Sequence, residues 1–273
     1  MTDYEKAVLR WHTLNIRDDA DLETELNGQI ALYAYHSGKI ENEHVTYDDT
    51  REIFEHDRIS SYTGDIRTIF ELVNAKRAME FFLESFAKRR PVDIPFLLEM
   101  QKILTENTYD ERRIKKGERP GEFKHHDYVV GKNETGAAAE DVEAELSELL
   151  ADVNSTLSAG MTDSQVLTAA AFFHAKFENI HPFSDGNGRT GRLVMNYYLV
   201  MNNHPMVIIH EEDRRTYFAA LDTWHEKQDL FPLKEFLEAQ VVKTWKRSLE
   251  RQENLEKLER KKSLKEDHDS LGW

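Results

Sequence analysis

The chain has 273 residues and a formal net charge of -15, from 36 basic and 51 acidic residues, which argues against a general binder of nucleic acid or of acidic membranes. It has no cysteine, so disulfides and thiolate metal sites are excluded, and 40% hydrophobic residues are enough for a sizeable core. Residues 1–10 lack an apolar signal core and no run of about 18 apolar residues occurs, so we expect a soluble cytoplasmic protein.

Helical spacing of apolar residues predicts helices through most of the first half of the chain. The first helix should end near Ser37-Gly38-Lys39-Ile40-Glu41-Asn42, which by itself is typical of a helix C-terminus. The basic run in 112–119 is typical of a solvated loop. The expected helical ranges are 21–40, a short helix in 46–60, 65–89 and 96–104.

One β-prone segment, residues 121–131, interrupts the helical pattern and is bounded by glycines. It predicts a small hairpin inside a helical protein. Asp163 is the expected N-cap of a following helix. The expected helices after the hairpin are 140–157, 166–179, 193–201, 213–226 and a charged helix from residue 234 onward.

Residues 181–192 combine chemically useful groups in one turn of chain: His-Pro-Phe-Ser-Asp-Gly-Asn-Gly-Arg-Thr-Gly-Arg. A Gly-Asn-Gly turn that opens a buried helix leaves backbone N–H groups unpaired at the positive end of the helix dipole, which is an anion site. Arg189 and Arg192 lie three residues apart and can reach further oxygens of a polyphosphate. His181 can take a proton, and Asp185 can hold a divalent cation.

Two other interpretations of this segment deserve comparison. Gly186-x-Gly188-x-x-Gly191 has the spacing of a dinucleotide-binding fingerprint, and Glu211 follows about 20 residues later. The strand that must precede such a fingerprint is missing, because residues 169–177 have helical character. A surface turn between two core helices explains the glycines but not the whole ordered set of residues.

The segment 181–192 matches the Fic family signature His-x-Phe-x-Asp-Gly-Asn-Gly-Arg-x-x-Arg at every fixed position, so the chain resembles Fic proteins. The resemblance implies an all-α fold with a Fic-fold helical core and a small β-hairpin flap. It divides the chain into an N-terminal helical region with an inhibitory helix (1–94), a catalytic core (95–240) and a charged C-terminal helix and tail (241–273). The implied activity is that of a protein adenylyltransferase, which moves AMP from ATP to a Ser, Thr or Tyr hydroxyl of a target protein with Mg²⁺.

The resemblance also implies roles for individual residues. His181 is the implied catalytic base, Asp185 the implied ligand of Mg²⁺, and Phe183 an apolar anchor of the loop. Trp224 and His225 are expected near the adenine by position. The implied nucleotide-binding residues are Asp185, Gly186, Asn187, Gly188, Arg189, Thr190, Gly191, Arg192, Tyr128, Val129, Val130, Gly131 and Tyr217.

A subset of Fic proteins carries an inhibitory helix with the pattern Ser/Thr-x-x-x-Glu-Gly/Asn, which Ser37, Glu41 and Asn42 match. The match implies that Glu41 pairs with Arg192 and repels the terminal phosphate. The flap implies a docked target protein of unknown identity, and self-modification and a homodimer stay open. A hydrolase that removes AMP at the same site, a non-catalytic phosphate-binding regulatory module and, more remotely, a nucleotide-dependent dehydrogenase are the alternatives.

Overall fold

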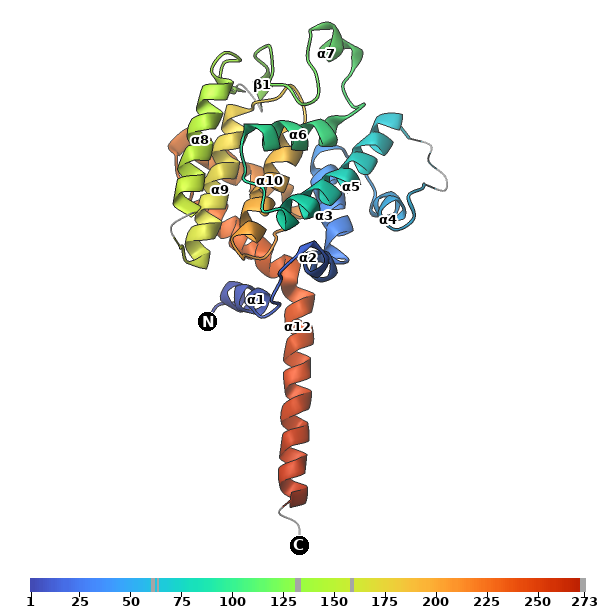
Figure 1. The fold of residues 1–273 in the computed structure, drawn as a ribbon, viewed down its shortest axis with the longest axis vertical. Helices are drawn as coiled ribbons and strands as arrows, with labels where there is room; N and C mark the ends of the chain where they lie inside the picture. Colours follow the sequence, from blue (N-terminus) through green and yellow to red (C-terminus); the bar gives the residue numbers. More distant parts are fainter. Residues whose placement is uncertain (60–61, 63, 131–133, 158–159, 271–273) are drawn as a thin grey trace.

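Helices make up almost all of the regular structure in a computed structural model that describes residues 1–59, 62, 64–130, 134–157 and 160–270 (Figure 1). Within these ranges, no helix is long and apolar enough to cross a membrane. The helices are α1 (Asp3–His12), α2 (Asp19–Leu26), α3 (Gln29–Glu41), α4 (Tyr47–His56), α5 (Ile66–Ala87), α6 (Ile94–Thr105), α7 (Glu111–Lys115), α8 (Val142–Leu157), α9 (Asp163–Ile180), α10 (Asn187–Met201), the 3-10 turn η1 (Glu211–Asp213), α11 (Arg214–Lys227) and α12 (Phe231–Ser270).

Helix α10 lies at the centre of the fold, with α9, α6, α3 and α5 packed around it. Its Tyr197 ring lies 4.7 Å from the ring of Phe96 on α6 and 5.5 Å from that of Phe82 on α5. The Tyr197 hydroxyl donates to the backbone oxygens of Ser85 and Arg90, so this buried polar group is satisfied. The helix predicted over 193–201 is confirmed, and it begins earlier, at Asn187, within the motif itself.

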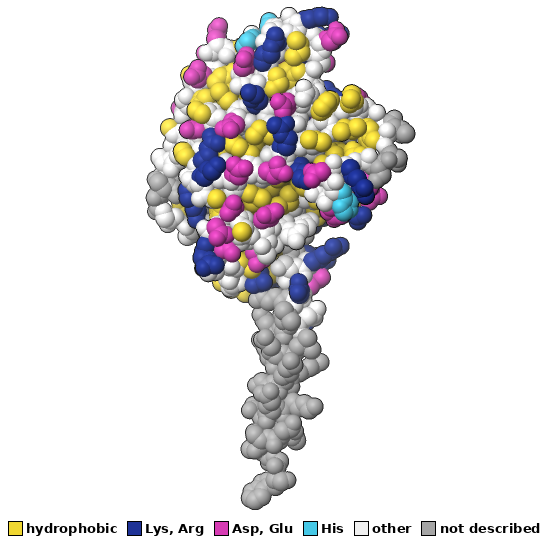
Figure 2. Space-filling model, turned by 45° about the vertical axis from the view of Figure 1, so that its right-hand side comes forward, with side chains coloured by type: hydrophobic (Ala, Val, Ile, Leu, Met, Phe, Trp, Pro, Cys, Tyr) yellow, Lys and Arg dark blue, Asp and Glu magenta, His cyan; other side chains and the backbone are white. Residues whose placement is uncertain are grey.

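The last helix, α12, extends well beyond the body of the molecule (Figure 1). Its first part packs on α1, where the rings of Trp11 and Trp245 meet edge-on at 5.3 Å. On the face seen in Figure 2, acidic and basic side chains alternate over the body with small apolar areas between them. The expected division into regions 1–94, 95–240 and 241–273 stays a prediction.

Several expected helix boundaries differ from the structure, and two of these differences have a clear physical reason. The helix expected over 21–40 is two helices, α2 and α3, because the chain turns at Asn27 and Gly28, where Gly28 has a φ of 81° that interrupts the helical backbone. The N-cap of α9 is Thr162 and not Asp163. The Thr162 hydroxyl accepts from Gln165 N while the Gln165 side chain accepts from Thr162 N, so both helix-end donors are paired.

The strands β1 (Val129–Val130) and β2 (Glu134–Thr135) form a short antiparallel pair. Val129 is opposite Thr135, and Val130 is opposite Glu134. The β structure begins later than expected, because two of the backbone donors ahead of it are used elsewhere. The N–H of Lys124 donates to Pro182 O at 2.9 Å, and that of His125 donates to the Glu118 carboxylate at 3.2 Å.

Candidate active site

The side-chain amide of Asn187 helps to fix the loop between α9 and α10 from inside. Asn187 accepts a hydrogen bond from Phe183 N at 2.9 Å and donates one to Phe183 O at 2.8 Å. The Phe183 ring is fully buried between Phe123 and Phe177, at centroid distances of 5.9 and 6.3 Å. The expected apolar anchor is therefore confirmed, and the side chain of Asn187, the first residue of α10, holds the loop.

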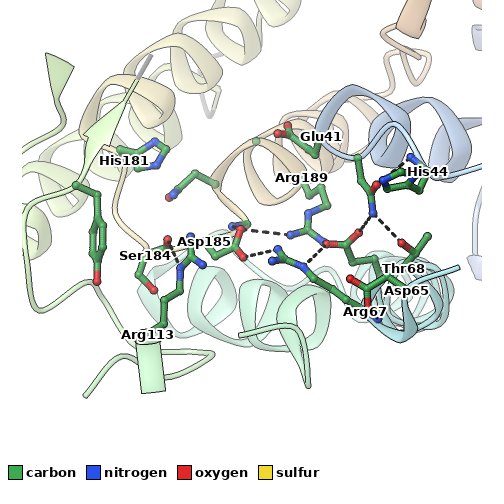
Figure 3. Close-up of a pocket in the computed structure, with 16 residues that line it drawn as sticks. Glu41, His44, Asp65, Arg67, Thr68, Arg113, His181, Ser184, Asp185 and Arg189 are labelled. Carbon is green, nitrogen blue, oxygen red and sulfur yellow. Dashed lines mark hydrogen bonds and ion pairs between the residues drawn. The ribbon is translucent and has the colours of Figure 1, made fainter. Parts of the chain in front are cut away.

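A cavity of about 510 Å³ opens over this loop and the first turn of α10 (Figure 3). That volume lies in the usual range for small-molecule sites. Gly186 is the N-cap of α10 and provides no side-chain hydrogen bond, so the first N–H groups of the helix face the cavity without a protein cap. The cavity is lined by Glu41, Asn42, His44, Asp65, Arg67, Thr68, Glu71, Arg113, Tyr128, His181, Ser184, Asp185, Gly186, Asn187, Gly188 and Arg189.

Arg189 is a buried cation with unused donors at this cavity. Its Nε and Nη1 atoms have no hydrogen-bond partner within the described part of the chain. The nearest carboxylate oxygens, on Asp185 and Glu71, lie 3.6 Å from its nitrogens. A buried guanidinium with free donors next to a helix N-terminus is suited to bind an oxyanion.

His181 ends α9 in the left-handed conformation, with a φ of 51°, and its side chain lines the cavity. Burial, and then the nearby charge of Lys124, lower the pKa of His181 to about 4. The ring is therefore neutral at pH 7, more completely than the ordinary value near 6.5 indicated from sequence. Its Nδ1 has no hydrogen-bond partner in the described residues.

The chain on both sides of the β pair is tied to the backbone around His181. Lys124 N donates to Pro182 O, and Ala137 N donates to Ile180 O, each at 2.9 Å. Gly136 packs so closely that a Cβ there would lie 2.7 Å from His181 Cβ. The expected nucleotide-binding residues of this segment fall in three groups: Tyr128 lines the cavity, only the backbone of Val129 and Val130 is described, and Gly131 lies outside the described residues.

Arg192 is fully buried beneath the cavity and is held by α3. Its Nη2 donates to Glu41 Oε1 at 2.8 Å and to Ser37 O at 3.0 Å, and its Nε donates to Ser37 Oγ at 3.1 Å. Burial alone lowers the pKa of this guanidinium, but the Glu41 carboxylate raises it above its ordinary value. The structure thus places the expected residues Ser37 and Glu41 together on Arg192.

The Glu41 carboxylate also covers the first turn of α10. A Cβ at Gly188 would lie 2.2 Å from Glu41 Oε1 and 2.9 Å from Arg192 Nη1. Only a residue without a side chain allows the acid to approach this closely. Asn42, the third residue of the expected set, instead turns toward α5, where its Nδ2 donates to Glu71 Oε2 at 2.7 Å and to Thr68 Oγ1 at 3.0 Å.

Some expected nucleotide-binding residues do not line this cavity. Thr190, Gly191 and Arg192 face inward from α10, toward the packed core. Tyr217 is fully buried, and its hydroxyl lies 2.7 Å from His174 Nε2. Trp224 packs edge-on against Phe172 at 5.6 Å. The expected adenine contact of Tyr217 stays a prediction, and Tyr217 does not line this cavity.

Two arginines of the cavity were missed by sequence analysis. Arg113 belongs to the basic run that was expected to be a solvated loop, but it lies on α7 and its Nε donates to Ser184 O at 3.2 Å. Arg67 comes from α5 and binds Asp185. A basic residue near the motif in space but distant in sequence gives no local signal, so only the fold could identify either one.

Fold and site together define an almost entirely helical protein in which a neutral, partly buried histidine lies beside the uncapped N-terminus of a central helix. Residues 91–199 match the Fic/DOC family, and this part of the chain is a Fic/DOC domain.

The similar proteins agree with this assignment. Protein adenylyltransferase fic-1 of Caenorhabditis briggsae is 29% identical over 192 residues, 70% of this chain and 36% of the relative. Protein adenylyltransferase Fic of Drosophila persimilis is 29% identical over 215 residues, 78% of this chain and 39% of the relative. The chain therefore spans less than half the length of these curated relatives.

Solved structures show the same fold. A Fic domain containing signaling protein from Bacteroides thetaiotaomicron superposes with a TM-score of 0.77 at 21% identity, over 91% of this chain and 96% of the other. Fic-1 from C. elegans superposes with a TM-score of 0.70 at 24% identity, over 94% of this chain and 73% of the other. Because both span most of this chain, the likeness in fold extends beyond the Fic/DOC domain.

Proposed function

We propose that this protein is a protein adenylyltransferase, which transfers AMP from ATP to a hydroxyl of a target protein. The observation that carries the proposal is the neutral ring of His181 in a cavity that also contains the uncapped start of α10 and the unused donors of Arg189. The curated relatives carry the same activity in their names.

In the reaction, the target hydroxyl gives its proton to His181 as its oxygen attacks the α-phosphorus of ATP. The bond between the α-phosphorus and the bridging oxygen breaks, and pyrophosphate leaves. Backbone N–H groups of Asn187 and Gly188 and the guanidinium of Arg189 stabilise the negative charge on the phosphate oxygens. A base that is already neutral at pH 7 needs no prior loss of a proton, which suits His181 to this role.

The donor set at Asp185 fits a magnesium ion that arrives with the nucleotide. Asp185 lines the cavity and directs its Oδ2 away from the loop, while its Oδ1 accepts from Gly186 N. No group of three or more metal-binding side chains occurs in the ranges the structure describes. Mg²⁺ is commonly held by one carboxylate together with phosphate and water. When bound, the ion would neutralise charge on the phosphates.

The β pair is suited to dock the target. Its two arms are tied by backbone hydrogen bonds to the residues that flank His181. A strand of the target that paired with its free edge would bring a hydroxyl to the base without demanding a specific sequence. We therefore assign the β1–β2 hairpin as the flap of this enzyme.

Glu41 is the proposed inhibitor of the enzyme. It neutralises Arg192 and places a carboxylate over Gly188, where a phosphate would otherwise lie. A like charge at that place repels the terminal phosphate, so the nucleotide is not held in the orientation for transfer.

The test is incubation of wild type, Glu41→Gly and Glu41→Gly/His181→Ala with α-labelled ATP and candidate target proteins. Label that becomes attached to protein only in the Glu41→Gly sample supports transfer.

Because Glu41 lines the cavity, its carboxylate could also orient a water molecule. Wild type that releases label from previously modified protein would favour removal of AMP, and binding of nucleotide without either reaction would favour the regulatory module.

A further inference from the structure

Arg67 bridges two carboxylates at the edge of the cavity. Its Nη2 donates to Asp185 Oδ2 at 2.8 Å, and its Nε donates to Glu71 Oε1 at 3.0 Å. Figure 3 shows the Arg67 side chain reaching from α5 toward Asp185. The two residues are 118 positions apart, and Arg67 precedes the segment that matches the Fic/DOC family.

The contact uses Asp185 Oδ2, the carboxylate oxygen that does not accept from the loop backbone. Oδ1 already accepts from Gly186 N at 2.7 Å and lies 3.6 Å from Arg189. Because the loop backbone already holds Oδ1, we place the divalent cation at Oδ2. Magnesium requires a close contact of roughly 2.0–2.1 Å to oxygen. The Arg67 guanidinium uses a lone pair of this oxygen, and its positive charge repels a cation, so it competes with metal binding there.

We propose that Arg67 is a built-in competitor for the metal at Asp185. A metal ion binds Oδ2 only when the Arg67 guanidinium leaves it. This inference rests on the proposed function for the role of Asp185 as the metal ligand. Glu41 is one proposed inhibitor of the site. Arg67 would be a second one, acting at the opposite end of the phosphate site.

The surroundings of Arg67 allow this exchange. Its side chain is 37% exposed, so it can withdraw toward solvent. Glu71, by contrast, is buried and is fixed by Asn42 through its other oxygen at 2.7 Å. Arg67 can therefore release Asp185 while it keeps its bond to Glu71, and its charge remains paired after the metal binds.

The test measures Mn²⁺, as a probe for Mg²⁺, by electron paramagnetic resonance of the free ion. Each protein is titrated without nucleotide and with α,β-methylene-ATP, in which the bond that breaks in the proposed transfer is blocked. We expect Arg67→Ala and Arg67→Gln to lower the Mn²⁺ concentration for half-saturation about three- to tenfold, as loss of a partly exposed ion pair allows.

Arg77→Ala is the matched control, because Arg77 lies on the same helix and pairs with Glu106 at the surface. It should leave Mn²⁺ binding unchanged. Adding Arg67→Ala to Asp185→Ala should have no further effect, since Arg67 acts through Asp185. Unchanged or weaker Mn²⁺ binding by both Arg67 variants, with the fold intact by circular dichroism, would overturn the proposal. Because the readout is bound Mn²⁺ and not transfer, the comparison of the variants tests this inference even if no adenylyl transfer is ever found.

Discussion

The carboxylate of Glu41 and the guanidinium of Arg192 meet at 2.8 Å although 151 residues separate them in the chain. The arginine is almost wholly inaccessible, with 2% of its side chain exposed, whereas 37% of the glutamate side chain is exposed. The acid is thus the partner that can move, and its departure would leave Arg192 still bound to Ser37.

Glu41→Gly should raise labelling of protein by α-labelled ATP about tenfold or more. A charge-assisted hydrogen bond contributes about 1.5 to 3 kcal/mol, and the partial exposure of Glu41 favours the lower end of that range. Labelling is read by gel autoradiography at several ATP and Mg²⁺ concentrations. Glu43→Gly, two positions further along the chain and outside the cavity, should label like wild type. Equal rates for Glu41→Gly and wild type would contradict the inhibitory role.

Adding Arg192→Ala to Glu41→Gly should remove most of that gain. The gain depends on a freed arginine, so the two changes are coupled and their effects do not add. The measurement is the labelling rate of the double variant beside both single variants. If the double variant labels as fast as Glu41→Gly, then Arg192 does not bind the nucleotide.

His181→Ala in the Glu41→Gly background should lower the transfer rate by roughly 100- to 10,000-fold, which is the usual contribution of a general base. Binding of Mg-ATP should stay nearly unchanged, because the residue acts on the incoming hydroxyl. Labelling rates and calorimetric titration check the two parts. Unchanged labelling would exclude His181 as the base.

The pH profile of Glu41→Gly should show no loss of a catalytic base between pH 7.5 and 5.5. With a folded pKa of about 4, His181 stays neutral over this window and gains a proton only below it. A histidine of ordinary pKa, about 6.5, would be about 90% protonated at pH 5.5 and the rate would fall about tenfold. A fall of that size in the transfer rate, with the fold intact, would contradict the assigned environment of His181.

Asn187→Ala should destabilise the protein by about 1 to 3 kcal/mol. The substitution leaves the N–H and C=O of Phe183 unpaired in a buried place. Urea unfolding followed by circular dichroism measures the change. Glu148→Ala, an exposed position on α8, should stay within about 0.5 kcal/mol of wild type. Equal midpoints for Asn187→Ala and wild type would show that the loop does not need this amide.

The site residues that the sequence predicted best are those that lie close together along the chain. His181, the uncapped turn and Arg189 share twelve consecutive residues, so a local pattern was enough to place them. Arg67 and Arg113 reach the loop from 118 and 71 positions away, and an arginine on a helix surface looks the same in sequence whether it meets solvent or a carboxylate. Helix packing decides which arginine meets the loop, and a short stretch of sequence holds no information about that packing.

Departures from the expected geometry have the same origin. Position along the chain placed Tyr217 near the adenine, which stays a prediction, and what the sequence did not indicate is that its hydroxyl contacts His174. Apolar spacing joined α2 and α3 into one helix, because a periodic pattern continues across a turn at Gly28 whose geometry the spacing does not record.

The backbone hydrogen bonds from Lys124 and Ala137 to the residues beside His181 hold the hairpin in place. They also limit which residue of a bound strand can reach the base. Because side chains of a strand alternate between two faces, a target strand paired with this edge presents only every second residue toward the base. A slip by one residue would turn the hydroxyl away altogether. Under the proposed function, the register of the bound strand would select the acceptor hydroxyl, so inserting one residue before a serine could create or remove a target.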